Sequence, residues 1–415
     1  MKLTREEQAM RAGEFGPAVA WAIDHQIKVG RFLGAEDFVP VSQAHIMADT
    51  ESLGAAGVEW LERMASLPPP QRRVRIPTIT DPRGTDFAAA VRLKQQPWMV
   101  DLERRAIAAF ESLGVLMTDT CINYQTIMPP VRGEHCAYGD TGVVIYSNSV
   151  CGARSNFEGG PSALSAGLTG RTPRYGYHLD ERRLASLIVE VGYTPRELSE
   201  WGALGGIVGR HSGDYWQVPV LVGIDRVPTS DEMKHFGAAL ASYGSVALFH
   251  MAGITPEAQR LDDVVPAGVS VRTHTVGEID IRAFIKSYAA AIDTVDLVVF
   301  SAPQLSLIEM RQLADLLDGR QTKIPLLAVT SPQVKPDADR MDLTARIERA
   351  GGTVLAGMCF YQSYAREMAE ANGWKALATN SAKLTNILGG YGYRPMLMSM
   401  QACVETACAG GRVAR

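Results

Sequence analysis

Side chains that can do chemistry gather in one stretch of this sequence, residues 118–183. Glycines recur through the stretch, and glycine lets the backbone approach a ligand or adopt a positive φ. Polar groups gathered around such glycines are typical of a site built from loops. We therefore expect the rest of the chain to act as a scaffold for this stretch. Its reactive side chains are Cys121, Glu134, His135, Asp140, Asn148, Ser149, Arg154, Asn156 and Glu158.

Cysteine is the residue type whose spacing says most about possible chemistry. The six cysteines form no C-x-x-C pair, which argues against a zinc ribbon or a thioredoxin-type motif. Cys121, Cys359 and Cys403 each follow a predicted strand, so their thiols can converge in space and hold an iron–sulfur cluster or a zinc ion. The alternative is that all three are small buried core residues.

Other polar side chains each have two interpretations. Glu134 beside His135 can form a general base with its partner, or a surface turn. Arg154 can clamp a carboxylate, or lie on a solvated face. Residues 156–161 precede a helix of small residues, where they can bind an anion at the helix N-terminus, or simply begin the helix. Lys383 follows a predicted strand end, which favours a role in a site over a solvated lysine.

The alternation of strands and helices predicts the scaffold. In the first part, a strand covers 38–46 and ends near His45, a helix covers 51–67, and a short strand at 115–118 delivers Cys121. From about residue 181 strands alternate with helices of about 10–15 residues, which indicates βαβ units and parallel sheet. Ligands bind beyond the carboxyl ends of such strands. The predicted strands are 187–191, 218–224, 246–250, 296–300, 324–329, 353–358, 376–379 and 395–400.

The same pattern suggests two parts. We divide the chain into an N-terminal part, residues 1–185, and an α/β part, residues 186–415, with residues 230–272 as a candidate subregion. The glycine-rich segment 202–209 lies within a predicted helix and does not follow a strand as G-x-G-x-x-G. We therefore interpret it as close helix packing and not as a dinucleotide site.

Composition excludes several classes of function. The 415 residues carry a formal net charge of −4, with 46% hydrophobic and 21% charged residues. This balance gives no electrostatic case for binding nucleic acid or an anionic membrane. There is no apolar run of about 18 residues, and the charged N-terminus is not a signal peptide. We therefore expect a cytoplasmic protein with reduced cysteines.

The block of residues 133–183 resembles the large subunit of aconitase X, a hydro-lyase family of the aconitase superfamily. Shorter matches are residues 44–46, 301–306 and 378–383, and Ser155–Gly159 is similar to a loop of ordinary aconitases. The resemblance implies an aconitase-like, multidomain α/β fold with parallel-sheet βαβ units and helices on both faces. It also implies an iron–sulfur cluster, of either the 2Fe–2S or the 4Fe–4S/3Fe–4S type.

The resemblance also implies cluster ligands. It places the first at Cys121 and the second at Cys359. In archaeal members, which are similar to mevalonate 5-phosphate dehydratase, the third cysteine stands in a Gly-Cys-Pro-His motif. Here that motif reads Ser301-Ala302-Pro303-Gln304, without the cysteine. Cys403 matches a cysteine of the bacterial members and is the predicted third ligand.

Bacterial members resemble cis-3-hydroxy-L-proline dehydratases, so we predict dehydration of cis-3-hydroxy-L-proline to Δ1-pyrroline-2-carboxylate. A Lewis-acidic iron must polarise the leaving hydroxyl, and a base must remove the α-proton. In this family the base belongs to a small swivelling domain. Because this chain ends at Arg415, soon after Cys403, we predict a separate small subunit in a heterodimer. The alternatives are a dehydratase of another hydroxy acid, such as mevalonate 5-phosphate, or a cluster-binding protein without activity.

Residue types and the resemblance together assign roles within this chain. Glu134, His135 and Lys383 are the predicted catalytic residues. Residues 48–50 depart from the Gly-Val-Ser of many relatives and residues 140–141 from their Glu-Ser, which points to a substrate different from, or smaller than, a phosphorylated mevalonate. The predicted substrate-binding residues are His45, Ala48, Asp49, Thr50, Asp81, Asp140, Thr141, Ser149, Arg154 and Asn156.

Overall fold

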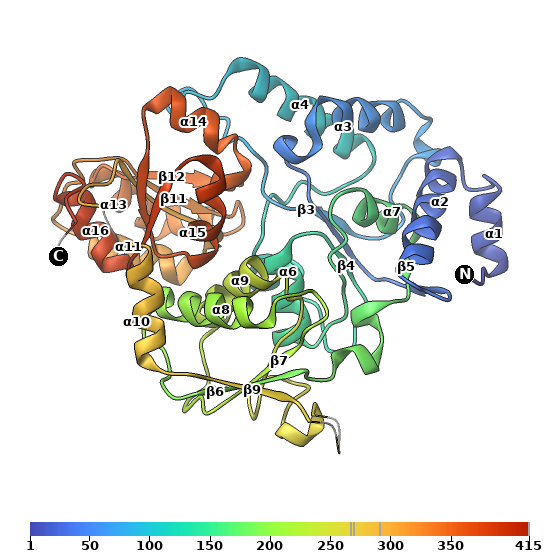
Figure 1. Ribbon diagram of the computed structural model, residues 1–415. Helices are drawn as coiled ribbons and strands as arrows, with labels where there is room; N and C mark the ends of the chain where they lie inside the picture. The colour runs from blue at the N-terminus through green and yellow to red at the C-terminus, as the bar shows by residue number, and fades with distance from the viewer. Residues whose placement is uncertain (266–267, 269, 290–291, 414–415) are drawn as a thin grey trace.

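The computed structural model describes residues 1–265, 268, 270–289 and 292–413. Among these residues the strands form four sheets, and Figure 1 shows three lobes around them. The N-terminal lobe lies at the right, the middle lobe at the bottom and the C-terminal lobe at the left. The predicted α/β fold is confirmed, while the division at residue 185 stays a prediction. No helix in the described residues is long and apolar enough to cross a membrane.

The first lobe is built on a three-stranded parallel sheet in the order β3-β2-β4. Residues 38–46, predicted as one strand, form two strands, because β1 pairs with β5 in a separate ribbon before the chain enters the sheet. The strands are β1 (Phe38–Pro40), β2 (Ala44–Ile46), β3 (Thr78–Thr80), β4 (Ala137–Tyr138) and β5 (Arg171–Pro173). The helices are α1 (Arg5–Arg11), α2 (Pro17–Phe32), α3 (Thr50–Ala65), α4 (Pro97–Ser112), α5 (Asn123–Thr126), α6 (Thr141–Tyr146) and α7 (Pro161–Thr169).

The second lobe has a parallel sheet in the order β8-β7-β6-β9, covered by α8 and α9 in close contact. A Cβ atom on Gly205 would lie 2.2 Å from the carbonyl oxygen of Phe236. The glycine-rich segment therefore serves helix packing, as predicted. The elements are β6 (Leu187–Val191), β7 (Pro219–Val222), β8 (His250–Met251), β9 (Arg272–Val276), α8 (Leu198–Ser212), α9 (Ser230–Gly244) and α10 (Glu278–Ser287).

The third lobe has a five-stranded parallel sheet in the order β12-β11-β10-β13-β14. Side chains alternate across a strand, so Val298 packs in the cluster that includes α11, α13 and α16, and Val299 in the cluster that includes α14 and α15. Helices thus cover both faces, as predicted. The elements are β10 (Leu297–Leu305), β11 (Leu326–Thr330), β12 (Thr353–Ala356), β13 (Ala376–Thr379), β14 (Arg394–Leu397), α11 (Leu307–Leu316), α12 (Lys335–Arg340), α13 (Leu343–Arg349), α14 (Ala365–Asn372), α15 (Ala382–Leu388) and α16 (Met400–Cys408).

Candidate active site

The carboxyl ends of two parallel sheets meet between the first and third lobes. Asp81 directly follows β3 and Asp140 follows β4, while Cys359 follows β12 and Lys383 follows β13. The Lys383 ammonium lies 3.3 Å from a carboxylate oxygen of Asp140. Gln362, just after Cys359, donates a hydrogen bond to Asp81 over 3.1 Å. Side chains far apart in the sequence therefore form one buried centre, where ligands bind in parallel α/β proteins.

Cys121 and Cys359 lie together at this centre. Both are buried, and burial raises the pKa of both thiols, that of Cys359 to about 12. The charge of Cys359 raises the pKa of Cys121 further, and Lys383 opposes the rise at Cys359. The Ser301 hydroxyl lies 3.9 Å from the Cys359 sulfur. The structure thus brings two of the three predicted ligands into one electrostatic environment.

Gln304 connects the loops that carry the two thiols. Its backbone N–H donates to the Cys121 sulfur over 3.4 Å, and its side-chain oxygen accepts from the Cys121 N–H at 3.3 Å. Its side-chain nitrogen donates to the carbonyl oxygens of Asp119 and Met358, the residues two before Cys121 and one before Cys359. One amide side chain therefore holds both loops.

Cys403 has different surroundings. It lies in the first half of α16 and not at the end of a strand, because the helix begins at Met400. Its neighbours in the core include Val404 and Ala407. Burial is the cause that raises its pKa, whereas charged groups act on Cys121 and Cys359. Cys403 belongs to the same large core cluster as Cys121, but no recorded interaction among the described residues joins its thiol to either of the other two. Its role as third ligand stays a prediction.

Buried carboxyl groups line the side of the centre that the first lobe supplies. Burial and the charge of Asp140 raise the pKa of Asp81 well above its ordinary value. Burial also acts on Asp140, but Lys383 and the N–H of Val143 hold the pKa of Asp140 below its ordinary value. Burial raises the pKa of Asp49 to about 6. The centre therefore combines an ionised carboxylate with carboxyl groups that hold protons readily.

Several buried polar atoms at the centre have no hydrogen-bond partner. His45 donates from Nε2 to the carbonyl of Thr120 at 2.9 Å and lies 3.7 Å from Asp81. Its Nδ1 is unpaired, and so are Oδ1 of Asp81 and Oε1 of Gln362. Buried polar atoms are rarely left unpaired in folded proteins. These atoms are therefore suited to bind a ligand that the chain by itself does not supply.

Glu134 and His135, predicted as catalytic, lie in a turn of the first lobe. The Glu134 carboxylate accepts from Gln43 at 2.9 Å and from the backbone N–H of Val131 at 2.7 Å. The two Nδ1 atoms of His135 and His178 are 2.9 Å apart. These contacts fix a surface turn, which was the alternative interpretation, and no interaction recorded for either side chain reaches Asp81 or Lys383. Their catalytic role stays a prediction.

Arg154, Ser149 and Asn156 bind backbone and side chains around them. Arg154 pairs with Asp180 and donates to the carbonyl of His178 at 3.0 Å. The Ser149 hydroxyl accepts from the N–H of Phe249, and the Asn156 amide donates to the carbonyl of Tyr175. The Ser149 contact joins the first lobe to the second, whereas these contacts of Arg154 and Asn156 lie within the first lobe. Their predicted substrate contacts stay untested.

The remaining predicted binding residues surround the carboxyl groups. Asp140 is the N-cap of α6, so Thr141 is the first residue of that helix. Asp49 is the N-cap of α3, where its carboxylate accepts from Ser52 at 2.8 Å. Ala48 is buried, and the Thr50 hydroxyl donates to Glu103 at 2.8 Å. These residues line the side of the centre that the first lobe supplies.

The donor set fits a thiolate-bound group in part. Two thiols lie together, and one sulfur already accepts an N–H, an interaction that stabilises a thiolate. Unpaired polar atoms lie beside them. Among the described residues, no three His, Cys, Asp or Glu side chains are arranged as a metal site. Cys121 and Cys359 would hold such a group from one side, and any further ligand would come from elsewhere.

Sequence patterns missed Gln304, Gln362 and Tyr361, whose ring centroid lies 5.6 Å from the Lys383 ammonium. Gln304 stands where the archaeal motif has histidine, and this departure marks the position in the sequence. Its contacts with the loops of Cys121 and Cys359 depend on the fold and are not visible in the sequence. Gln362 bridges Asp49 and Asp81, at 3.3 and 3.1 Å. Nothing in its local sequence indicates this.

Comparison with known sequences tests the family directly. Models of the aconitase X first, second and third domains match residues 1–181, 185–286 and 295–409. This chain belongs to the aconitase X family. It is therefore a hydro-lyase, and its fold matches that of the Thermococcus kodakaraensis aconitase X holo-form with a TM-score of 0.88 and 30% identity, over 98% of this chain and 100% of that chain.

Two kinds of aconitase X relative are similar to this chain. The phosphomevalonate dehydratase large subunit of Methanothermobacter thermautotrophicus is 35% identical, over 94% of each chain. The one from Thermococcus kodakarensis is 31% identical, over 98% of this chain and all of its own. The cis-3-hydroxy-L-proline dehydratase of Pseudomonas aeruginosa is 30% identical, over 99% of this chain but 70% of its own length.

Proposed function

We propose that this chain is the large subunit of an iron–sulfur dehydratase that converts cis-3-hydroxy-L-proline to Δ1-pyrroline-2-carboxylate. The observation that carries the choice of substrate is the charge of the centre. Carboxyl groups of Asp49, Asp81 and Asp140 outnumber the Lys383 ammonium there, and Lys383 is already paired. A cyclic amino acid brings a cationic nitrogen, which would favour the ionised forms of Asp49 and Asp81, whose pKa values burial raises, and so can bind them. A phosphate ester would bring more negative charge to the same carboxylates.

Different residues of this chain would hold the cluster and bind the substrate. Cys121 and Cys359 would hold the cluster, which supplies a Lewis acid for the leaving hydroxyl. Lys383 can bind the substrate carboxylate, while Asp140 keeps the lysine charged. Asp81 faces the centre with an unpaired oxygen and is placed to bind the substrate nitrogen.

The reaction balances as an elimination. A base removes the α-proton, its electron pair forms the carbon–carbon double bond, and the C3–oxygen bond breaks. The leaving oxygen takes a proton and departs as water, and the enamine then tautomerises to the cyclic imine. We propose that the base belongs to a small subunit of one swivelling domain, roughly 130–150 residues long. Relatives named as large subunits support a partner of this kind.

Dehydration of mevalonate 5-phosphate is the second candidate. One observation favours it: the relatives that match this chain over nearly their whole length are named phosphomevalonate dehydratase large subunits. Parallel assays of the anaerobically prepared complex with both compounds separate the two. Turnover of cis-3-hydroxy-L-proline alone supports the first candidate, and turnover of mevalonate 5-phosphate alone supports the second.

A further inference from the structure

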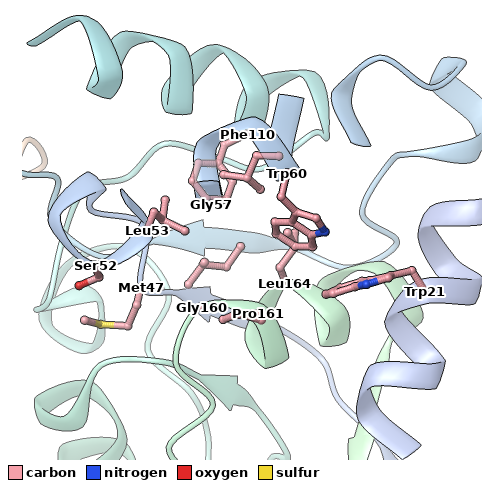
Figure 2. Close-up of a pocket in the computed structure, with 12 residues that line it drawn as sticks. Trp21, Met47, Ser52, Leu53, Gly57, Trp60, Phe110, Gly160, Pro161 and Leu164 are labelled. Atoms are coloured by element: carbon pink, nitrogen blue, oxygen red, sulfur yellow. The ribbon is translucent and has the colours of Figure 1, made fainter. Parts of the chain in front are cut away.

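An apolar cavity of about 500 Å³ opens on the first lobe beside the active centre. Its walls come from four helices, α2, α3, α4 and α7, and its floor from β2. Figure 2 shows Trp21 and Trp60 at one end and Met47 and Ser52 at the other. Leu53, Phe110 and Leu164 complete the apolar lining. A cavity of this size holds one or two large side chains.

The rim of the cavity resembles the centre of a protein interface. Trp21 is 36% exposed and packs on Trp60 with ring centroids 4.6 Å apart. Aromatic anchors of this kind concentrate binding energy in protein–protein contacts. Beside them α3 exposes Ala55 and Ala56, whose small side chains let a partner approach closely. Such an apolar concavity at a surface is typical of an interaction site.

The inner end of the cavity is joined to the active centre. The sulfur of Met47 lies 3.9 Å from the Gln362 amide nitrogen, which also bonds Asp49 and Asp81. Asp49 caps the helix that carries Ser52 and Leu53. A polypeptide seated in the cavity would therefore contact the loop that presents Asp49, and would lie next to the centre it has to complete.

The lengths of the relatives point to a polypeptide occupant. This chain matches 94% or more of the large subunits named above but 70% of the cis-3-hydroxy-L-proline dehydratase, whose remaining part has no counterpart here. That remaining part belongs to the same polypeptide as the region equivalent to this chain. We propose that the cavity is the docking site of the small subunit, which inserts apolar side chains between Trp21, Trp60 and Leu53. The inference rests on the proposed two-subunit function.

Binding of the proposed small subunit tests the inference. Leu53→Asp places a charge in the lining, and Trp21→Ala removes an aromatic anchor. Each variant should raise the dissociation constant for the small subunit about tenfold or more. Phe32→Ala is the matched control, because Phe32 is also an exposed aromatic of α2 but does not line the cavity; its affinity should stay within about twofold. Unchanged thermal unfolding shows that the variants fold.

The outcomes separate the two hypotheses. If the wild-type chain binds no small subunit, the proposed two-subunit function fails and the inference with it. If the wild type binds, but Leu53→Asp and Trp21→Ala bind equally well, only the docking site is wrong. The dye 8-anilinonaphthalene-1-sulfonate gives a second readout. It should bind the free chain, less so Leu53→Asp, and be displaced by the small subunit. Dye that remains bound in the complex would show a cavity open to small molecules and overturn the inference.

Discussion

The backbone N–H of Gln304 donates to the sulfur of Cys121 over 3.4 Å, while the side chain of Gln304 binds the loop of Cys359. This relationship joins the two thiols through one residue. It predicts that Gln304 positions both cysteines. Gln304→Ala would leave three buried backbone groups unpaired and should cost about 2–4 kcal/mol of unfolding free energy, with loss of bound iron.

Chemical denaturation and iron analysis of the same preparation check this prediction. Gln401→Ala is the control, because Gln401 is exposed on α16 and its side chain donates to Glu405 on the same helix. The control should retain wild-type stability and iron. Wild-type iron content in Gln304→Ala would show that the two loops do not need the bridge.

The cysteines should differ in their effect on bound iron. Cys121→Ser and Cys359→Ser should each lose most of the iron and sulfide of the anaerobic protein, because each removes a thiolate from the pair. Cys408→Ser, at the partly exposed end of α16, should have no effect. Cys403→Ala should keep its iron and lose about 1–2 kcal/mol of stability from the buried space it leaves. Loss of iron in Cys403→Ala would restore Cys403 as the third ligand.

The ion pair of Lys383 and Asp140 should be needed for both stability and binding. Lys383→Met leaves the buried Asp140 carboxylate unpaired, which should cost about 3–5 kcal/mol. The double variant Lys383→Met/Asp140→Asn removes the charge as well and should recover most of that stability, but no activity. A double-mutant cycle in denaturant measures the coupling. Additive losses would mean that the two groups do not interact.

Buried carboxyls should make stability depend on pH. Burial raises the pKa of Glu103 to about 7, above the value of about 4.3 in an unfolded chain. Between these values the folded state holds the proton and the unfolded state has lost it, so the free energy of unfolding falls as pH rises from about 4.5 to about 7. For Glu103 alone the fall is about 4 kcal/mol.

Glu103→Gln isolates that contribution. The glutamine can still accept from Thr50 and from the N–H of Gly84, so the variant should gain stability at pH 8 and show a flatter pH profile. Glu59→Gln, at an exposed position of α3, should leave the profile unchanged. Denaturant midpoints at four or five pH values measure both. A wild-type slope in Glu103→Gln would mean that Glu103 is ionised throughout.

Much of the fold was predictable from local sequence, because the buried strands of the third lobe are short apolar runs between helices. The placement of Cys359 and Lys383 at strand ends followed from that pattern. Cys403 also comes after the last strand but lies within α16, which starts at Met400, and its role as third ligand stays a prediction. The short strand predicted at 115–118 was wrong; only an isolated bridge joins Leu116 to Ile79.

The site was harder to predict than the fold because its members meet only in three dimensions. Glu134 and His135 look like a catalytic pair in sequence, yet in the structure each side chain makes hydrogen bonds to residues of its own lobe. Gln362 looks ordinary in sequence and Gln304 shows only a departure from the archaeal motif, yet both bridge loops from different lobes. An amide side chain is uncharged and belongs to no local sequence motif, so its role depends on which loops the fold brings together.

Turnover by the complex tests the central claim most directly. The chain and its small subunit, purified together without oxygen, are assayed with cis-3-hydroxy-L-proline and with mevalonate 5-phosphate, and iron is measured in the same sample. We predict bound iron, release of Δ1-pyrroline-2-carboxylate from the first compound, no product from the second, and no activity in the large chain alone. An iron-free complex that still turns over, or one active only on mevalonate 5-phosphate, would contradict the account.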